Sequence, residues 1–106
     1  MRCAMMILMM TTLPAAALDG VFDTDCSAEV SEMRVTIARG EISFWESSCR
    51  LTNPVNVRDI DGAVLYDAVC SGEGEEWTLR MLLMPGHDGG LIRVVSGFAI
   101  TYDRCR

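Results

Sequence analysis

The sequence predicts an all-β fold: a small antiparallel meander of six or seven strands that forms a barrel or half-barrel and is cross-linked by two disulfides. Three observations predict it. Runs in which apolar and polar residues alternate indicate strands with one buried face. Short glycine-bearing connections join successive runs, and no helical crossover pattern lies between them. An even set of cysteines remains once the N-terminal leader is set aside, and a bridge between the two ends of the domain favours closure of the sheet.

Residues 1–17 are predicted to be a signal peptide. Basic Arg2 precedes a run of apolar or small residues over 3–13, Pro14 follows, and residues 15–17 are the small alanines that signal peptidase needs. We therefore expect cleavage before Leu18, a single domain over residues 18–106, and a periplasmic or secreted product. A membrane anchor is the alternative, but about 12 apolar residues are too few to cross roughly 30 Å of hydrocarbon. We expect no membrane insertion after cleavage.

The acidic balance of the chain restricts its partners. Fifteen Asp and Glu residues outweigh nine basic residues, which gives a formal net charge of −6. Such a charge, with no basic run, argues against nucleic acid and against anionic membrane surfaces. An envelope protein or another cationic partner remains, although solubility alone also explains an acidic surface.

Four cysteines lie outside the leader, at Cys26, Cys49, Cys70 and Cys105. In a short exported chain they indicate two disulfides, and four cysteines allow three connectivities. If residues whose numbers sum to about 119 face each other in a hairpin, Cys49 lies opposite Cys70, which leaves Cys26 with Cys105. A zinc site is the alternative, but the chain has no Cys-x-x-Cys pair.

The first elements are a short strand at Val21-Phe22 and a hairpin over residues 33–46 that turns at Arg39-Gly40. Pairing residues whose numbers sum to 79 gives one apolar face. That face contains Met33, Val35, Ile37, Ile42 and Phe44. A helix beginning near residue 28 is the alternative for the first arm, but β-branched residues favour a strand beyond Met33.

The later elements follow the same alternation. An arm from Cys49 is interrupted at Asn53-Pro54, where we expect an edge or a bulge. A strand over residues 63–70 then turns at residues 72–75 into a strand over 77–84, with paired numbers summing to about 147. If residues at equal distances on either side of the turn at residues 85–90 pair with each other, the apolar residues of the two strands share one face, and this face is the predicted core. Its members are Trp77, Leu79, Met81, Leu83, Ile92, Val94 and Phe98.

Two sets of candidate site residues follow from this arrangement. The alternation points Glu46 to the buried face, where a carboxylate needs a charged partner, and Arg104 on the closing strand is the predicted partner in a structural ion pair. A binding surface is predicted from an exposed aromatic residue and the acidic turns, although packing and solvated turns also explain these residues. Its members are Trp45, Glu73, Glu75, Glu76 and Asp88.

No catalytic, cofactor or metal site is predicted. The single histidine, His87, lies between glycine-rich segments at a hairpin tip, and no cysteine is free to act as a nucleophile. Asp59-x-Asp61-Gly62 resembles the start of a calcium loop, but position 70, where that loop needs a glutamate, is a cysteine. We expect no cofactor and no enzymatic activity.

Three short motifs carry a resemblance: Glu46-Ser47-Ser48-Cys49, Cys70-Ser71-Gly72-Glu73-Gly74-Glu75 and Arg104-Cys105. With them, the chain resembles small four-cysteine exported proteins of alphaproteobacteria over most of residues 20–106. The resemblance implies a periplasmic protein and assigns no functional residue. Periplasmic lysozyme-inhibitor barrels are similar in size and β content, but their Ser-Gly-Ala-Arg-Tyr-like segment is missing here.

The function predicted first is therefore a non-enzymatic binding or envelope-associated protein. A small-ligand carrier or an inhibitor-type barrel is the alternative, and it requires an open barrel interior. A hydrolase ranks last, because no convergent catalytic constellation is visible.

Overall fold

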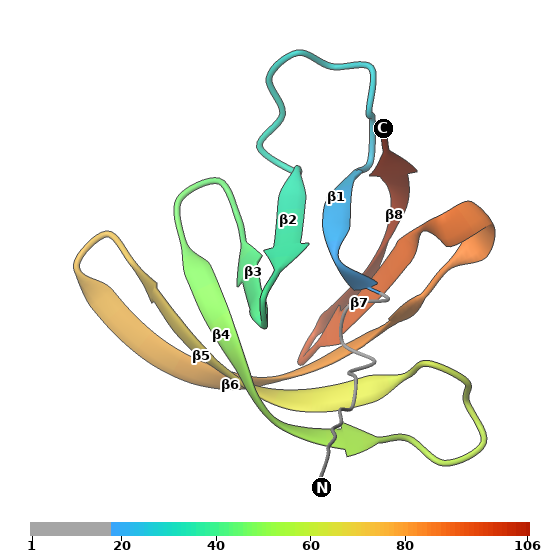
Figure 1. Cartoon of the computed structure of the whole chain (residues 1–106). Helices are drawn as coiled ribbons and strands as arrows, with labels where there is room; N and C mark the ends of the chain where they lie inside the picture. Colours follow the sequence, from blue (N-terminus) through green and yellow to red (C-terminus); the bar gives the residue numbers. More distant parts are fainter. Residues whose placement is uncertain (1–17) are drawn as a thin grey trace, which may run out of the picture.

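Eight strands in sequential order form a closed antiparallel barrel in the computed structural model of the chain, which describes residues 18–106 (Figure 1). The predicted signal peptide, residues 1–17, lies outside the described residues. The strands are β1 (Gly20–Asp23), β2 (Val35–Ala38), β3 (Glu41–Ser43), β4 (Ser48–Asn56), β5 (Val64–Gly72), β6 (Glu75–Pro85), β7 (Leu91–Val95) and β8 (Phe98–Cys105). A short 3₁₀ turn, η2 (His87–Gly89), separates β6 from β7. No helix in this part of the chain is both long enough and apolar enough to cross a membrane.

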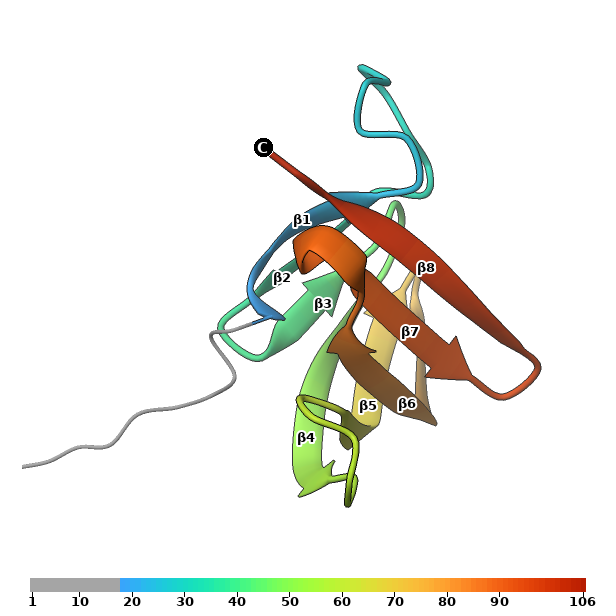
Figure 2. The same ribbon diagram turned by 90° about the vertical axis from the view of Figure 1, so that its right-hand side faces the viewer.

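Closure is made by β1 and β8, which pair antiparallel with Phe22 opposite Arg104. Figure 2 shows these two strands side by side. The predicted barrel is thus confirmed over the half-barrel, with eight strands in place of six or seven. Closure leaves no unpaired sheet edge among the described strands, which removes the usual template for edge-to-edge association.

Three predicted registers are confirmed. Ile37 pairs with Ile42, Cys49 with Cys70, and Ala68 with Leu79. The turns explain two of them, because Arg39-Gly40 and Glu73-Gly74 have positive φ at both residues, as tight two-residue hairpins require. The predicted bulge at Asn53-Pro54 is also present, since the β4–β5 register shifts between Thr52 and Val55.

Both predicted disulfides are present. Cys49 and Cys70 are bonded across β4 and β5, and both are buried in the barrel interior. Cys26 and Cys105 join the connection after β1 to the end of β8. One bridge therefore lies within the core, and the other ties together the two strands that close the barrel.

The core prediction is wrong on β7. Pro85 pairs with Leu91, so the β6–β7 register is shifted by one residue from the predicted reflection. A shift of one residue exchanges the two faces of a strand, and Ile92 and Val94 are consequently not core residues. Leu91 and Tyr102 are buried in their place. The buried apolar set is Leu18, Phe22, Val35, Ile37, Ile42, Cys49, Ala63, Tyr66, Ala68, Cys70, Met81, Leu83, Leu91 and Tyr102.

The same shift places Arg93 among aromatic rings. Its guanidinium carbon lies 4.8 Å from the centre of the Phe44 ring and 5.4 Å from that of Phe98, and its Nε donates to the Tyr102 hydroxyl over 3.0 Å. Phe98 itself is 54% exposed, and Trp77 is 39% exposed. The two aromatic residues predicted for the core thus lie partly open to solvent.

Residues 24–34 form neither helix nor strand. Met33, predicted for the apolar face of the hairpin over residues 33–46, lies outside β2 and is 42% exposed, because a turn from Ser31 to Arg34 precedes the strand. The helix alternative is likewise wrong for this segment.

Candidate functional site

Alternate connections of an antiparallel meander emerge at the same end of the barrel. The β1–β2, β3–β4, β5–β6 and β7–β8 connections therefore share one end, which we call the acidic end. Its exposed carboxylates come from these connections and the residues next to them. They are Asp25, Glu29, Glu32, Glu46, Glu73, Glu75 and Glu76.

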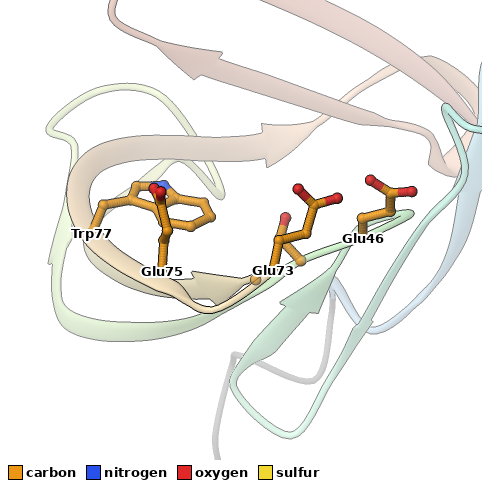
Figure 3. Close-up of a pocket in the computed structure, with 6 residues that line it drawn as sticks. Glu46, Glu73, Glu75 and Trp77 are labelled. Carbon is orange, nitrogen blue, oxygen red and sulfur yellow. The ribbon is translucent and has the colours of Figure 1, made fainter.

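A recess of about 350 Å³ lies at the acidic end, between the β3–β4 turn and the β5–β6 hairpin. Figure 3 shows the Glu46 and Glu73 carboxyl groups side by side, and Glu75 and Trp77 line the same recess. The turn that carries Glu46 is closed by a 2.7 Å hydrogen bond from the Phe44 amide to the Ser47 carbonyl. We call this feature the glutamate recess.

Gly72 brings the two hairpins together. A Cβ atom added to Gly72 would lie 2.6 Å from the Glu46 carbonyl oxygen and 2.7 Å from Cβ of Ser47. Only a residue without a side chain permits that approach. The glycine at the end of β5 therefore sets how closely Glu46 and Glu73 meet.

The Glu73 carboxyl group perturbs that of Glu46. A hydrogen bond with Glu73 raises the pKa of Glu46, and the Glu73 charge, partial burial and the Glu32 charge raise that pKa further, while a hydrogen bond with Trp45 opposes them. The nearby negative charge of Glu73 disfavours ionisation of Glu46. Neither residue belongs to any of the salt bridges found among residues 18–106.

The predicted ion pair between Glu46 and Arg104 is wrong. Glu46 is exposed, because β3 ends at Ser43 and the alternation that would bury position 46 stops there. Arg104 instead donates from Nε to the Gly89 carbonyl and from Nη1 to the Asp19 carbonyl, and it lies 4.8 Å above the Phe22 ring. Its role in the structure is to tie β8 to the start of β1 and to the β6–β7 connection.

Among the ion pairs of residues 18–106, Asp23 with Arg34, at 2.9 Å, has a buried carboxylate. Asp23 is fully buried, and it also accepts hydrogen bonds from the Ser31 hydroxyl and the Asp25 amide. Burial alone would raise the pKa of Asp23, but hydrogen bonds from Ser31, from the Asp25 and Thr24 amides and from Arg34 outweigh it and hold that pKa below the usual value.

The predicted binding surface is divided by the structure. Glu73 and Glu75 lie in the glutamate recess, and Glu76 is exposed beside them at the start of β6. Trp45 is 52% exposed and lies on the other side of the β3–β4 turn. Asp88 is exposed on η2, at the opposite end of β6. Four of the five residues thus share the acidic end, and Asp88 does not.

Sequence reasoning missed Trp77 as part of the site, because the residue continues the apolar alternation of β6. A signal was present: Trp77 lies opposite Cys70, and only two residue pairs separate it from the turn of the β5–β6 hairpin. An aromatic residue that close to a strand end has a face open to solvent.

Carboxylates and an indole that line one recess suit the binding of organic cations. Carboxylates accept hydrogen bonds from guanidinium and ammonium groups, and an indole face attracts the same cations. No group of three or more metal-ligating side chains lies together among residues 18–106.

In comparisons with known proteins, no protein-family model, no curated protein and no solved structure matches the chain.

Proposed function

We propose that this chain is a non-enzymatic binding domain of the cell envelope or of the secreted fraction, and that its glutamate recess binds cationic groups of a partner polypeptide. One observation carries the proposal. Glu46 and Glu73 are held against each other, and no Arg or His of the described chain neutralises them. A guanidinium or ammonium group between the two carboxylates would relieve their repulsion.

Two further features support a cationic partner. Glu32 adds negative charge beside Glu46, and the Trp77 indole forms one wall of the recess. Cation–π attraction at a partly exposed site contributes about 0.5–1 kcal/mol. Carboxylates and indole therefore act on the same bound group.

The small-ligand carrier is the weaker candidate. An apolar cavity does lie at the other end of the barrel, lined by Leu18, Leu51, Tyr66 and Leu83, but its volume is about 150 Å³. Ligand pockets typically measure about 300–1,000 Å³. Side chains fill the rest of the interior, as expected for a barrel of this size.

A hydrolase is a weaker candidate than a binding domain. The Glu46–Glu73 pair invites comparison with aspartic proteases, in which two neighbouring carboxyl groups share a proton. Such a pair works in a site that excludes water, where the surrounding protein fixes its geometry. Here Glu46 and Glu73 are exposed on two turns. This setting suits the capture of a charged group better than acid–base catalysis.

Titration of the domain with a short peptide of alternating Arg and Ser tests the proposal. The double variant Glu46→Gln with Glu73→Gln should weaken binding about five- to tenfold at low ionic strength, since exposed charge pairs are each worth a few-fold in affinity. The matched control is Asp59→Asn with Asp61→Asn in the exposed β4–β5 connection, at the opposite end, which removes the same charge.

The control should change affinity less than about twofold. Equal weakening by both double variants would show attraction to the net charge of the domain and would refute the recess as the site.

A further inference from the structure

A groove lies beside the glutamate recess, on the other side of the β3–β4 turn. Its volume is about 370 Å³, and its walls include Glu29, Val30 and Ser31 from the β1–β2 connection and Phe44 and Trp45 from the β3–β4 turn. Trp45 and Glu46 are adjacent in sequence, so the groove and the recess share one turn. We call this feature the tryptophan groove.

Exposed apolar surface gathers along the groove. Val30 is 73% exposed, and the Trp45 side chain is 52% exposed. Exposed apolar residues that stand together, rimmed by polar ones, mark an interaction site more often than scattered single residues do. The rim here is acidic, because Glu29 belongs to the groove and Glu32 lies close to Glu46.

The outer wall of the groove is fixed in place. Asp23 accepts hydrogen bonds from Ser31 and Arg34 at 2.9 Å each, and Arg34 Nη2 donates to the Ala28 carbonyl at 2.6 Å. The Cys26–Cys105 disulfide holds the beginning of the same connection. A wall held at both ends loses little conformational entropy when a partner binds, which favours affinity.

From these observations we infer that the tryptophan groove receives an apolar side chain of the same polypeptide whose basic side chain occupies the glutamate recess. The partner is then an amphipathic basic segment, in which apolar and basic residues are close in sequence. This inference rests on the proposed function, which concerns the recess alone.

Charge and surface chemistry select this occupant. A metal ion or a polyamine would leave Val30 and Trp45 without a function, since neither presents apolar side chains. Anionic lipid would be repelled by the glutamates of the acidic end. A polypeptide that carries both kinds of side chain matches the groove and the recess together.

The experiment compares two peptides of equal length and charge, one alternating Arg with Leu and the other alternating Arg with Ser. The wild-type domain should bind the Arg/Leu peptide about tenfold more tightly, because burial of one leucine side chain is worth at least that factor. Trp45 fluorescence should change with the Arg/Leu peptide, measured in a Trp77→Phe background.

Val30→Ser with Trp45→Ala should abolish the preference. Val30→Ser alone should reduce the preference and leave the affinity for the Arg/Ser peptide within about twofold, because Val30 does not line the glutamate recess. The matched control is Val55→Ser, which alters another exposed valine, 58% exposed, on β4. It should keep the tenfold preference. All of these residues are exposed, so near-ultraviolet circular dichroism should show folded variants.

The outcomes separate the two proposals. Equal affinity of the domain for both peptides, together with weaker peptide binding by the Glu46→Gln and Glu73→Gln double variant, would refute the groove as a binding site. The proposal for the recess would still be supported. Failure of both peptides to bind would refute both. Dimers of the free domain that dissociate on Trp45→Ala would show that a second copy covers the groove, and that result would also refute the inference.

Discussion

Asp23 is the residue on which the β1–β2 connection depends. Its buried carboxylate accepts hydrogen bonds from Ser31, Arg34 and the Asp25 amide, so one side chain holds together a segment that contains neither helix nor strand. An irregular connection with this internal support behaves as part of the barrel. The sequence offered no signal for it, because Asp23 looked like one of several acids in a polar stretch.

The depressed pKa of Asp23 predicts how stability depends on pH. A carboxyl whose folded pKa lies below its unfolded value, about 3.9, stabilises the fold fully above that value. The contribution is lost as pH falls through the folded pKa. Asp23→Asn should therefore lower the free energy of unfolding at neutral pH, and its deficit should shrink below about pH 4.

Urea unfolding of wild type and Asp23→Asn across this range provides the measurement. A deficit that stays constant with pH would contradict the ionised role of Asp23.

The raised pKa of Glu46 predicts a dependence of stability on pH of the opposite sign. Its folded pKa is raised by Glu73, so the ionised form carries a penalty above that pKa, and the penalty disappears as pH falls below the unfolded value of about 4.3. Glu46→Gln should raise the thermal midpoint at neutral pH and leave it unchanged in acid. Scanning calorimetry at several pH values tests this.

Asp61→Asn, in the exposed β4–β5 connection, is the control for removal of one charge. If it raised the midpoint as much as Glu46→Gln did, the repulsion would belong to the whole surface and not to the pair.

At the scale of elements, the β5–β6 hairpin and the β3–β4 turn build the glutamate recess by close approach at Gly72. Gly72→Ala should separate them, because the added methyl group meets the Glu46 carbonyl and Ser47. We expect a cost of about 1–3 kcal/mol in stability. Weaker binding of the Arg/Ser peptide should accompany it, with the pKa of Glu46 returning toward its usual value.

Gly74→Ala is the matched control on the same hairpin. Its φ of +82° makes alanine strained, but nothing lies within 4 Å of the added atom. It should cost about 1 kcal/mol and leave peptide binding intact. Carboxyl resonances in nuclear magnetic resonance titrations distinguish the two variants, and unchanged Glu46 titration in Gly72→Ala would contradict the role of the close approach.

Most elements could be predicted from the sequence because period-2 alternation and two-residue glycine turns act locally. The hairpin at Arg39-Gly40 is of this kind. The β6–β7 register could not be predicted by reflection, since Pro85 belongs to the strand and the turn is centred on Asp88, in the left-handed region at φ 55°. Turn geometry, not the apolar pattern, decided which face of β7 is buried.

The candidate site was predicted only in part for a related reason. Trp45, Glu73, Glu75 and Glu76 stand out as exposed residues, but their grouping depends on which connections share an end of the closed barrel. Glu46 was assigned to the interior by alternation that the short β3 does not sustain. The contact between Glu46 and Glu73 arises from tertiary packing, which no local pattern encodes.

At the scale of the whole molecule, the two disulfides differ in the loops that they close. The Cys26–Cys105 bridge spans 79 residues and the Cys49–Cys70 bridge spans 21. Loop-closure entropy assigns about 4.5 kcal/mol to the longer loop and about 3.3 kcal/mol to the shorter one. Removal of the cysteines as pairs, by alanine substitution, should lower the free energy of unfolding by about these amounts.

The shorter bridge is buried, so its removal should also leave a small cavity and exceed its entropic value. Denaturant unfolding of both paired variants is the measurement. A negligible effect of Cys26→Ala with Cys105→Ala would show that the barrel ends are held by β1–β8 pairing alone.

The pairing of β1 with β8 has a consequence for biogenesis. Strand β1 emerges from a ribosome or a translocation pore before the other seven strands, and its partner β8 emerges after them, so the ring cannot be completed until β8 has been delivered. Until then the nascent chain carries two open hydrogen-bonding edges, which attract other strands. A product terminated just before Phe98 would keep these edges permanently and should precipitate where the full chain stays in solution.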